Sequence, residues 1–451
     1  MKTSAVILAA GQGTRMRSRL PKVLHPLMGY PMVWYALRAA QEATGSRPTL
    51  VIGYAADQVR ATMGEAASYV IQEHQLGTGH ALRQAEEALR GKADFVLVTT
   101  ADMPLLTAQT LEKIVKAQQN HAGPLTLLTV LSEDSFGFGR VIRDATGGVQ
   151  EVIEEAHATP EQLAIRELNT SVYCFSADWL WPALRRIPLS PKGEYYLTDL
   201  VGIAVKEGLS VQAVISPDAQ ETIGVNTRVH LAQAGLVLRQ RINTAWMLEG
   251  VTIIDPATTY IEPGVKLDFD TTIWPNTYLH GETTAGEGCQ LGPNSIIRDS
   301  TLGERCRVVG SYMEGARLED EVEIGPFARL RKDAHLGRGV HMGNFGEIKN
   351  SYLGPDTKMG HFSYIGDATI GPGVNIGAGT ITCNLGMDGK KSPTEIGAGA
   401  FIGSDTMLVA PVKIGEGSAT GSGAVVTKNI PPNSLAVGMP ARVIRKLKKD
   451  D

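Results

Sequence analysis

A six-residue repeat in the second half of the chain most constrains what it can fold into. Two unbroken series of aliphatic residues recur at this period: Leu330, Leu336, Met342 and Ile348, and later Ile396, Ile402, Leu408 and Ile414. Five more, with two five-residue steps, lie between them: Leu353, Met359, Ile365, Ile370 and Ile376. A hexapeptide period is the signature of a β-helix. We therefore predict a parallel β-helix over 250–451. Three hexads would form one triangular coil, the aliphatic side chains would point inward, and residues 18 apart would stack.

The first half has a different pattern, in which short apolar runs alternate with helical stretches. We predict strands over 5–8, 50–53 and 95–98, and a helix over 56–63. Strands that alternate with helices favour a mostly parallel sheet covered on both faces. We expect a Rossmann-like α/β domain over 1–225.

The segment 226–249 contains no proline and carries an apolar stripe at helical spacing. The stripe consists of Leu231, Leu238, Ile242 and Ala245. We predict that this segment is a linker helix between the two domains.

The overall composition excludes several classes of partner. A net charge of −4 gives no reason to expect a nucleic-acid ligand. The four cysteines are far apart and are expected to be reduced thiols. The apolar run 5–10 is too short for a signal peptide or a membrane span, so we expect a cytoplasmic protein without a membrane partner.

A glycine-rich turn follows the first predicted strand, with Gly11 and Gly13 at its centre. We expect the turn to open a helix whose N-terminal N–H groups can bind a phosphate. A G-x-G sequence is also common in simple tight turns. The cations Arg15 and Lys22 close behind it favour a triphosphate site.

Asp102 lies at the carboxyl end of the third predicted strand, where ligand crevices of α/β sheets are found. A carboxylate there must either cap the next helix or meet a cation, because burial without a partner is costly.

With these residues, the chain resembles the sugar-1-phosphate nucleotidyltransferases. The motif 75–80, Gln-Leu-Gly-Thr-Gly-His, narrows the resemblance to N-acetylglucosamine-1-phosphate uridylyltransferases. Because it extends over the whole chain, the resemblance is to the bifunctional family that combines this uridylyltransferase with a glucosamine-1-phosphate N-acetyltransferase on a left-handed β-helix.

The resemblance implies specific roles in the first domain. Arg15 and Lys22 would be catalytic through charge neutralisation, while Asp102 and Asn226 would bind Mg²⁺. The UTP and UDP-N-acetylglucosamine contacts would be Leu8, Ala9, Ala10, Gly11, Lys22, Gln72, Gly77, Thr78, Gly139, Glu154, Asn169 and Asn226. The phosphate of the sugar would attack the α-phosphorus of UTP in line, and no general base is needed because this phosphate is already an anion.

Arg331 and Lys349 lie 18 residues apart in the unbroken repeat, so their backbones should stack about 4.8 Å apart. Like charges at that distance are unfavourable unless an anion lies between them. The two cations either splay apart on the surface or clamp the phosphate of glucosamine-1-phosphate.

The resemblance also implies the remainder of the second site. His361 would be the general base that takes a proton from the amino group of glucosamine-1-phosphate. Tyr364 and Asn375 would join Arg331 and Lys349 in binding the sugar phosphate, and Glu347 could orient His361. The acetyl-CoA contacts would be Ala378, Asn384, Ser404, Ser422 and Arg442. The sequence departs from the family at Leu385, often a tyrosine there, and at Met439, often an arginine.

The expected function is therefore the synthesis of UDP-N-acetylglucosamine from glucosamine-1-phosphate, acetyl-CoA and UTP, which supplies peptidoglycan and other cell-envelope glycans. The flat outer faces of a β-helix favour association, and the resemblance implies a homotrimer with acetyl-transfer sites between subunits. Two alternatives remain: a transferase for a different sugar, and a non-catalytic scaffold. The presence of the phosphate-loop cations, Asp102, Asn226 and His361 favours an enzyme.

Overall fold

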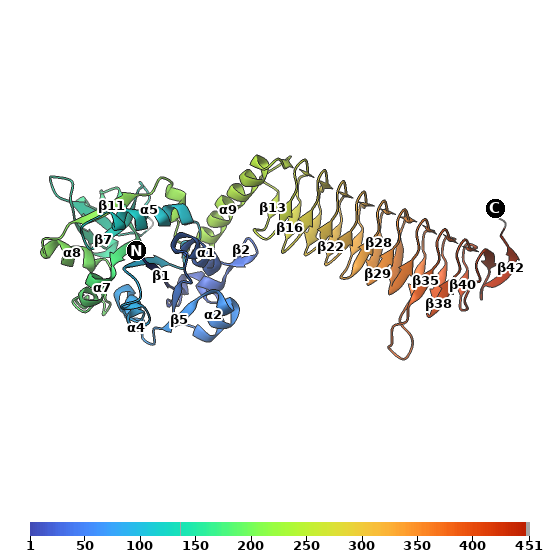
Figure 1. The fold of residues 1–451 in the computed structure, drawn as a ribbon, viewed down its shortest axis with the longest axis horizontal. Coiled ribbons are helices and arrows are strands. Elements are labelled where there is room, and N and C mark those ends of the chain that lie inside the picture. Colours follow the sequence, from blue (N-terminus) through green and yellow to red (C-terminus); the bar gives the residue numbers. More distant parts are fainter. Residues whose placement is uncertain (136, 448–451) are drawn as a thin grey trace. The chain divides into compact units, whose positions relative to one another are not determined.

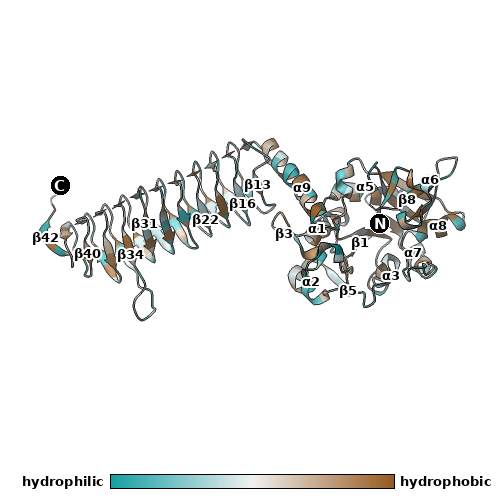
Figure 2. Ribbon diagram, turned by 180° about the vertical axis from the view of Figure 1, so that it is seen from behind, coloured by the Kyte–Doolittle hydropathy of each residue, from teal (hydrophilic) through white to brown (hydrophobic). Residues whose placement is uncertain are grey.

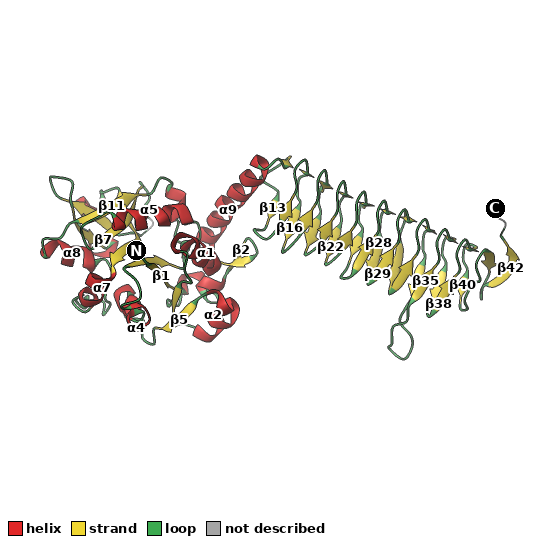
Figure 3. Cartoon of the chain, viewed as in Figure 1, coloured by secondary structure: helices red, strands yellow, loops and turns green. Residues whose placement is uncertain are grey.

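The structure is a computed structural model that describes residues 1–135 and 137–447. The chain divides into two compact units, Met1–Leu238 and Arg239–Asp451 (Figure 1). In the described residues the helices lie in the first unit, except that α9 (Arg228–Leu248) continues into the second, and short strands dominate the second (Figure 3). None of the helices in the described part of the chain has the length and apolar character needed to cross a bilayer.

The first unit is built on one sheet in the order β11-β7-β10-β6-β1-β4-β5. Its strands are β1 (Thr3–Leu8), β4 (Thr49–Ile52), β5 (Ser68–Ile71), β6 (Phe95–Thr100), β7 (Leu125–Leu131), β10 (Glu167–Ser176) and β11 (Val211–Ile215). β10 runs antiparallel to both neighbours, and the other pairs along this path are parallel. A side ribbon of β8 (Arg140–Arg143) and β9 (Val149–Ile153) joins β10. The mostly parallel sheet predicted from the alternating pattern is confirmed.

Helices cover both faces of this sheet because its strands carry apolar residues on both sides. Along β1, Ala5 and Ile7 face one core and Val6 faces the other. The first core is covered by α1 (Met32–Thr44), α2 (Ala56–Met63) and α5 (Ala108–Gln119). The second is covered by α3 (Thr78–Arg83), α7 (Ala177–Leu184) and α8 (Asp199–Lys206). The predicted helix over 56–63 is α2.

The helix expected directly after the glycine turn does not form. Two three-residue 3₁₀ turns follow β1 instead, η1 (Thr14–Met16) and η2 (Lys22–Leu24), and the first α-helix begins at Met32. The prediction was wrong because two glycines at 11 and 13 and three prolines at 21, 26 and 31 interrupt the segment. Proline removes a donor and glycine costs backbone entropy, so a continuous helix is disfavoured.

The linker prediction corresponds to α9 (Arg228–Leu248), which carries both apolar and polar residues (Figure 2). Ala234 and Val237 pack in the first unit, whereas Asn243 and Trp246 pack in the second. Three residues of the predicted stripe are half-buried, namely Leu231, Leu238 and Ile242. The prediction was wrong at Ala245, which is exposed, because the neighbouring Asn243 and Trp246 take the inward positions.

The second unit is a solenoid of three parallel sheets, in which every third strand joins the same sheet. The first sheet begins with β12 (Thr252–Ile253), the second with β13 (Tyr260–Ile261) and the third with β14 (Lys266–Leu267). All the aliphatic residues of the six-residue repeat lie in one continuous core. This is the predicted parallel β-helix, and its three hexad faces are those of a left-handed β-helix.

The β-helix ends with a strand that runs backwards. β42 (Arg442–Lys446) pairs antiparallel with β41 (Ser434–Val437) and covers the last parallel edge. One excursion interrupts the regular coils, between β34 (Ile381–Cys383) and β35 (Thr394–Ile396), and protrudes from the stack (Figure 1).

Candidate active sites

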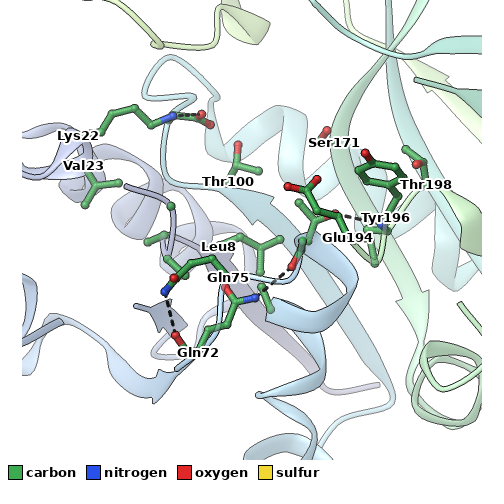
Figure 4. Close-up of a pocket in the computed structure, with 18 of the residues that line it drawn as sticks. Leu8, Lys22, Val23, Gln72, Gln75, Thr100, Ser171, Glu194, Tyr196 and Thr198 are labelled. Carbon is green, nitrogen blue, oxygen red and sulfur yellow. Dashed lines mark hydrogen bonds and ion pairs between the residues drawn. The ribbon is translucent and has the colours of Figure 1, made fainter. Parts of the chain in front are cut away.

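A cavity of about 530 Å³ opens in the first unit at the carboxyl ends of β1 and β6. This is the edge of an α/β sheet where ligands bind. Eleven of the predicted ligand residues line it: Leu8, Ala9, Ala10, Gly11, Arg15, Lys22, Gln72, Gly77, Thr78, Asp102 and Glu154. Figure 4 shows Lys22 and Gln72 entering from one side and Tyr196 and Thr198 from the other.

Two cations and two oxygen ligands meet at one end of this cavity. Lys22 Nζ donates to Asp102 Oδ2 at 2.6 Å and to Asn226 Oδ1 at 3.1 Å. Arg15 Nη2 donates to the same Asn226 oxygen at 3.0 Å. The backbone explains how residues so distant in sequence meet, because Val225 N–H donates to Asp102 O at 2.7 Å.

Asp102 thus meets a cation and does not cap the following helix, α5, whose cap is Thr107. Burial alone would raise the pKa of the Asp102 carboxyl, but the Lys22 charge and hydrogen bonds from Lys22 and Thr100 outweigh it. The pKa therefore lies below its ordinary value, and the group is a carboxylate at neutral pH.

The same oxygens fit a divalent cation. Asp102 Oδ2 and Asn226 Oδ1 both lie within hydrogen-bond distance of one ammonium, so they converge on a position where positive charge is held. Two oxygen donors of this kind suit a metal that takes its other ligands from substrate phosphates and water. Within the described residues no three His, Cys, Asp or Glu side chains gather into a separate metal cluster.

Two glycines shape the loops around the cavity. Gly13 has φ +66°, and a Cβ there would lie 2.4 Å from Lys22 Cβ, so its absence lets Lys22 pack against the turn. Gly77 has φ +94°, and a Cβ there would lie 2.6 Å from Tyr195 O. Other residues would be strained at both positions.

A network of side-chain amides forms the floor of the cavity. Gln72 is only 3% exposed, and its Nε2 donates to Gly77 O at 3.1 Å. The same nitrogen lies 3.0 Å from His80 Nδ1. Thr78 Oγ1 accepts from Leu197 N–H at 3.0 Å, which ties this floor to the opposite wall.

The three predicted sugar contacts differ in how far they lie behind the surface of the cavity. Glu154 lines the cavity and accepts from Thr198 Oγ1 at 2.9 Å. Asn169 lies behind the lining, 2% exposed, and donates to Tyr173 OH at 2.7 Å. Gly139 lies behind it as well, and its carbonyl accepts from Asn169 N–H at 2.8 Å. Asn169 and Gly139 therefore reach the cavity through Tyr173.

Sequence reasoning missed most of the opposite wall. The missed lining residues include Ser171, Tyr173, Glu194, Tyr196, Leu197 and Thr198. The one available signal was a pair of tyrosines, Tyr195 and Tyr196, directly after Gly193-Glu194 in a stretch without strand or helix pattern. Aromatic residues in such a loop often mark a binding surface.

On the β-helix, the predicted stacking of Arg331 and Lys349 is confirmed by the strand register. Leu330 of β25 (Arg329–Leu330) pairs with Ile348 of β28 (Gly346–Lys349), so the residues that follow them lie on adjacent coils. Arg331 N–H donates to Ile348 O at 2.9 Å. The two cations therefore belong to one face.

Charges from three coils surround these cations. Arg331 Nη1 donates to Glu347 Oε1 at 2.9 Å, and Lys391 Nζ lies 3.8 Å from Asp367 Oδ2. Lys391 and Arg331 lower the pKa of Lys349, because neighbouring positive charge opposes its protonation. The described residues contain no hydrogen bond between Glu347 and His361. Three cations against two carboxylates leave excess positive charge at this face.

Four predicted residues follow one another along one corner of the prism. His361, Ala378, Ser404 and Ser422 occupy the same corner of successive coils. The strand registers define this alignment, because Tyr364 pairs with Ile381, Ile381 with Met407 and Met407 with Val425, and each of these lies three residues after a corner residue. We call these four residues the corner column; His361 at its start is exposed.

The predicted sugar ligands divide between the two faces that meet at this corner. Tyr364 lies in β31 (Ser363–Gly366), in the same sheet as β25 and β28. Asn375 lies in β33 (Asn375–Ile376), which belongs to another sheet. Among the predicted acetyl-CoA residues, Asn384 donates to Asp367 Oδ2 and Arg442 lies exposed in β42. One copy of the chain thus presents these ligands in two directions.

Comparison with known proteins agrees with both folds. Residues 5–192 match the family described as MobA-like NTP transferase domain, and residues 393–428 match bacterial transferase hexapeptide (six repeats). A protein of Exiguobacterium sp. named bifunctional protein GlmU is 44% identical over 97% of both chains. Proteins of the same name from Trichlorobacter lovleyi and Heliobacterium modesticaldum are also 44% identical, the former over 100% of this chain and 99% of its own, the latter over 97% and 95%.

Proposed function

Because the chain belongs to the family of the bifunctional GlmU proteins, we propose that its two units perform the two half-reactions of UDP-N-acetylglucosamine synthesis. The second unit acetylates glucosamine-1-phosphate from acetyl-CoA. The first unit transfers UMP from UTP to the N-acetylglucosamine-1-phosphate so formed and releases pyrophosphate. The product supplies peptidoglycan and other cell-envelope glycans.

We assign uridylyl transfer to residues 1–225. The sugar phosphate attacks the α-phosphorus of UTP, the new P–O bond forms, and the bond to pyrophosphate breaks. Arg15 and Lys22 hold the triphosphate in line for this attack and neutralise its charge. A divalent ion, which we propose to be Mg²⁺ held by Asp102 and Asn226, supplies further charge neutralisation when bound.

The remaining contacts follow from where the residues lie around the cavity. Gln72, Gly77 and Thr78 bind the uracil at the floor, and Glu154 with Asn169 and Gly139 positions the acetylated sugar. The first loop contacts the nucleotide through four residues: Leu8, Ala9, Ala10 and Gly11. Several of these residues come from loops after different strands, which is typical of catalytic sites in α/β folds.

We assign acetyl transfer to residues 250–451, with 226–249 as the linker. His361 takes a proton from the amino group of glucosamine-1-phosphate, the neutral amine attacks the thioester carbon, and the C–S bond breaks to release CoA. The N–H of Ala378 faces the developing oxyanion. Arg331 and Lys349 bind the phosphate, and Tyr364 and Asn375 bind the sugar.

Acetyl-CoA lies along the corner column in this proposal. Ala378, Ser404 and Ser422 follow His361 coil by coil, so an extended ligand can run along them with its thioester beside the base. Asn384 lies at the sugar end and Arg442 at the far end. Ser404 and Ser422 offer small polar contacts along the column.

We further propose that the enzyme is a cytoplasmic homotrimer. The sugar ligands of one chain divide between two faces, and the outward directions of two faces of a triangular prism diverge. A complete acetyl-transfer site therefore combines one face of one subunit with the other face of its neighbour. Closed cyclic symmetry gives each subunit interface the same site.

The single observation that carries the proposal is that Lys22 and Asp102 line one cavity with Gln72, while Lys22 Nζ is shared between the Asp102 and Asn226 oxygens. The test is to offer the purified protein glucosamine-1-phosphate, acetyl-CoA, UTP and Mg²⁺ and to identify products by mass spectrometry. We expect UDP-N-acetylglucosamine, pyrophosphate and CoA in equal amounts. Omission of acetyl-CoA should stop both product sugars, whereas omission of UTP should leave N-acetylglucosamine-1-phosphate. UDP-glucosamine as the main product would refute the order.

A further inference from the structure

Two neighbours hold the Gln72 carboxamide: the carbonyl group of Gly77 and the ring of His80. Gln72 Nε2 lies 3.1 Å from the carbonyl oxygen of Gly77. A carbonyl accepts hydrogen bonds and never donates them, so the atom facing it must be the NH₂ group and not the amide oxygen. The hydrogen-bonding requirement of the Gly77 carbonyl therefore places the NH₂ end of the Gln72 amide toward Gly77.

The second N–H of this group points to His80. Gln72 Nε2 lies 3.0 Å from Nδ1 of the His80 ring, which is half-buried at the third position of α3. Burial and the charge of Arg83 lower the pKa of His80, more than a backbone hydrogen bond at His74 raises it. The ring is therefore neutral at pH 7, and one of its nitrogens can accept.

Another amide competes for this ring. Gln84 Nε2 lies 3.2 Å from His80 Nε2 and 3.0 Å from the His80 carbonyl. A neutral imidazole accepts at one nitrogen only. Gln84 is half-buried on the outside of the helix and can turn to water, whereas Gln72 is 3% exposed and has no such alternative. Burying an unpaired donor is costly, so Nδ1 is the nitrogen that accepts.

With both N–H groups used, only the Oε1 atom of Gln72 is left for a ligand. No group in the described residues donates to Oε1, and Gln72 lines the cavity. We propose that His80 is a positioning residue that holds Gln72 with its oxygen toward the nucleobase, so that the site accepts uracil and rejects cytosine. The inference rests on the uridylyl transfer proposed above.

The chemistry of the two bases explains the discrimination. Uracil carries a hydrogen on N3, which an amide oxygen accepts. Cytosine has a lone pair on N3 and an amino group on C4. A fixed amide oxygen therefore opposes the cytosine lone pair. If the amide turned over, its NH₂ group would favour cytosine, but its oxygen would then face both Gly77 O and His80 Nδ1.

The test measures kcat/KM for UTP and for CTP in His80→Leu, His80→Asn and His80→Gln. Asparagine places an oxygen acceptor where Nδ1 stands; glutamine reaches the position of Nε2 and leaves Nδ1 empty. We expect the UTP/CTP ratio to fall roughly tenfold in His80→Leu and His80→Gln, mainly through KM for UTP. His80→Asn should retain most of the ratio. Gln84→Leu is the matched control and should leave the ratio unchanged.

The outcomes separate the inference from the function on which it rests. A wild-type ratio in folded His80→Leu and His80→Gln would overturn the role of His80, as would an equal loss in His80→Asn. Should His80→Leu fail to fold, the Asn/Gln pair decides alone. If Gln72→Leu also leaves the ratio unchanged, the uracil site itself is misassigned. Far-UV circular dichroism and urea unfolding of every variant report whether the first unit, which contains all the substituted residues, is folded.

Discussion

The two candidate sites of this chain are built in opposite ways. In the first unit, loops distant in sequence surround a cavity, and the charged pair at its end is mostly buried, with side chains 13% and 23% exposed for Lys22 and Asp102. In the second unit, residues one coil apart line a face and a corner, and the pair Arg331–Glu347 is 39% and 31% exposed. The first site is enclosed by one chain, while the second lies open at the surface.

This difference has an energetic consequence. Charges in the cavity are screened less by water, so each contact there contributes more than an equivalent contact on an open face. Charges on the β-helix face are screened as little as those in the cavity only when another surface covers this face. We therefore expect single substitutions to act most strongly in the cavity, and assembly to matter only for the β-helix site.

The largest effect is expected for Asp102→Ala. The change removes a proposed metal ligand and leaves Lys22 without its carboxylate, so UDP-sugar formation should fall below detection. Acetyl transfer should remain near the wild-type rate because its ligands lie in the other unit. Steady-state kinetics of each half-reaction will measure both. Glu112→Ala, an exposed carboxylate of α5, is the control. Equal loss of both activities in folded Asp102→Ala would contradict the assignment.

The second effect is expected for His361→Ala on the exposed corner. Removal of a positioned base should lower the acetylation rate by roughly 10² to 10⁴. The apparent affinity for glucosamine-1-phosphate should change much less, and uridylyl transfer from preformed N-acetylglucosamine-1-phosphate should not change. If His361→Ala acetylates at the wild-type rate, the histidine is structural, and Glu347 becomes the next candidate for the base.

Arg331→Ala should give a smaller effect, and chiefly on binding. The substitution removes a charge-assisted contact to the sugar phosphate, so KM for glucosamine-1-phosphate should rise several-fold or more. Arg331 also donates to Glu347, so the variant frees a carboxylate that repels the phosphate. Arg329→Ala, in β25 two residues before Arg331 and outside the proposed clamp, is the control. An unchanged KM in Arg331→Ala would show that the two cations merely splay at the surface.

Dilution tests whether the β-helix site, unlike the cavity of the first unit, needs a neighbouring subunit. If the β-helix site is completed by a neighbour, acetyl transfer per chain should decrease at concentrations where sedimentation equilibrium shows dissociation. Uridylyl transfer per chain should stay constant over the same range, because its cavity belongs to one chain. A stable monomer that acetylates at full rate would contradict the homotrimer.

The same contrast decides what the sequence could predict. The inward residues of the β-helix, such as Leu330 and Ile348, follow from a strict period. The alignment of the corner column does not follow from a strict period, because its steps are 17, 26 and 18 residues. The longest step contains the excursion 384–393. The far wall of the cavity, including Glu194, was missed because no period or motif marks a loop. A local hydrophobic pattern shows which residues are buried. The geometry of a ligand site depends instead on how loops distant in sequence come together.

The smallest expected effect concerns the stability of the exposed solenoid. Glu262 accepts from His280 Nδ1 at 2.7 Å and from Gly281 N–H at 2.6 Å. Burial would raise the pKa of Glu262, but these hydrogen bonds outweigh it and hold the pKa below 4.5. A depressed carboxyl pKa contributes stability above the unfolded-state pKa and loses it as pH falls through the folded-state pKa.

Glu262→Gln should therefore lower the free energy of unfolding by about 1 kcal/mol at pH 7, the usual size of a hydrogen bond to a charged group on a partly open surface. The difference from wild type should shrink as pH falls below the ordinary glutamate pKa and disappear below the lower folded-state pKa, because the carboxyl of folded wild type is then protonated as well. Urea unfolding at several pH values will measure this difference in the free energy of unfolding.

Glu395→Gln is the control. It removes a more exposed ion pair, in which Glu395 and Lys413 are 50% and 63% exposed, and should change stability less. Because Glu262 lies outside the cavity, its variant should leave uridylyl transfer at the wild-type rate; a loss there would mean that the two units do not act independently.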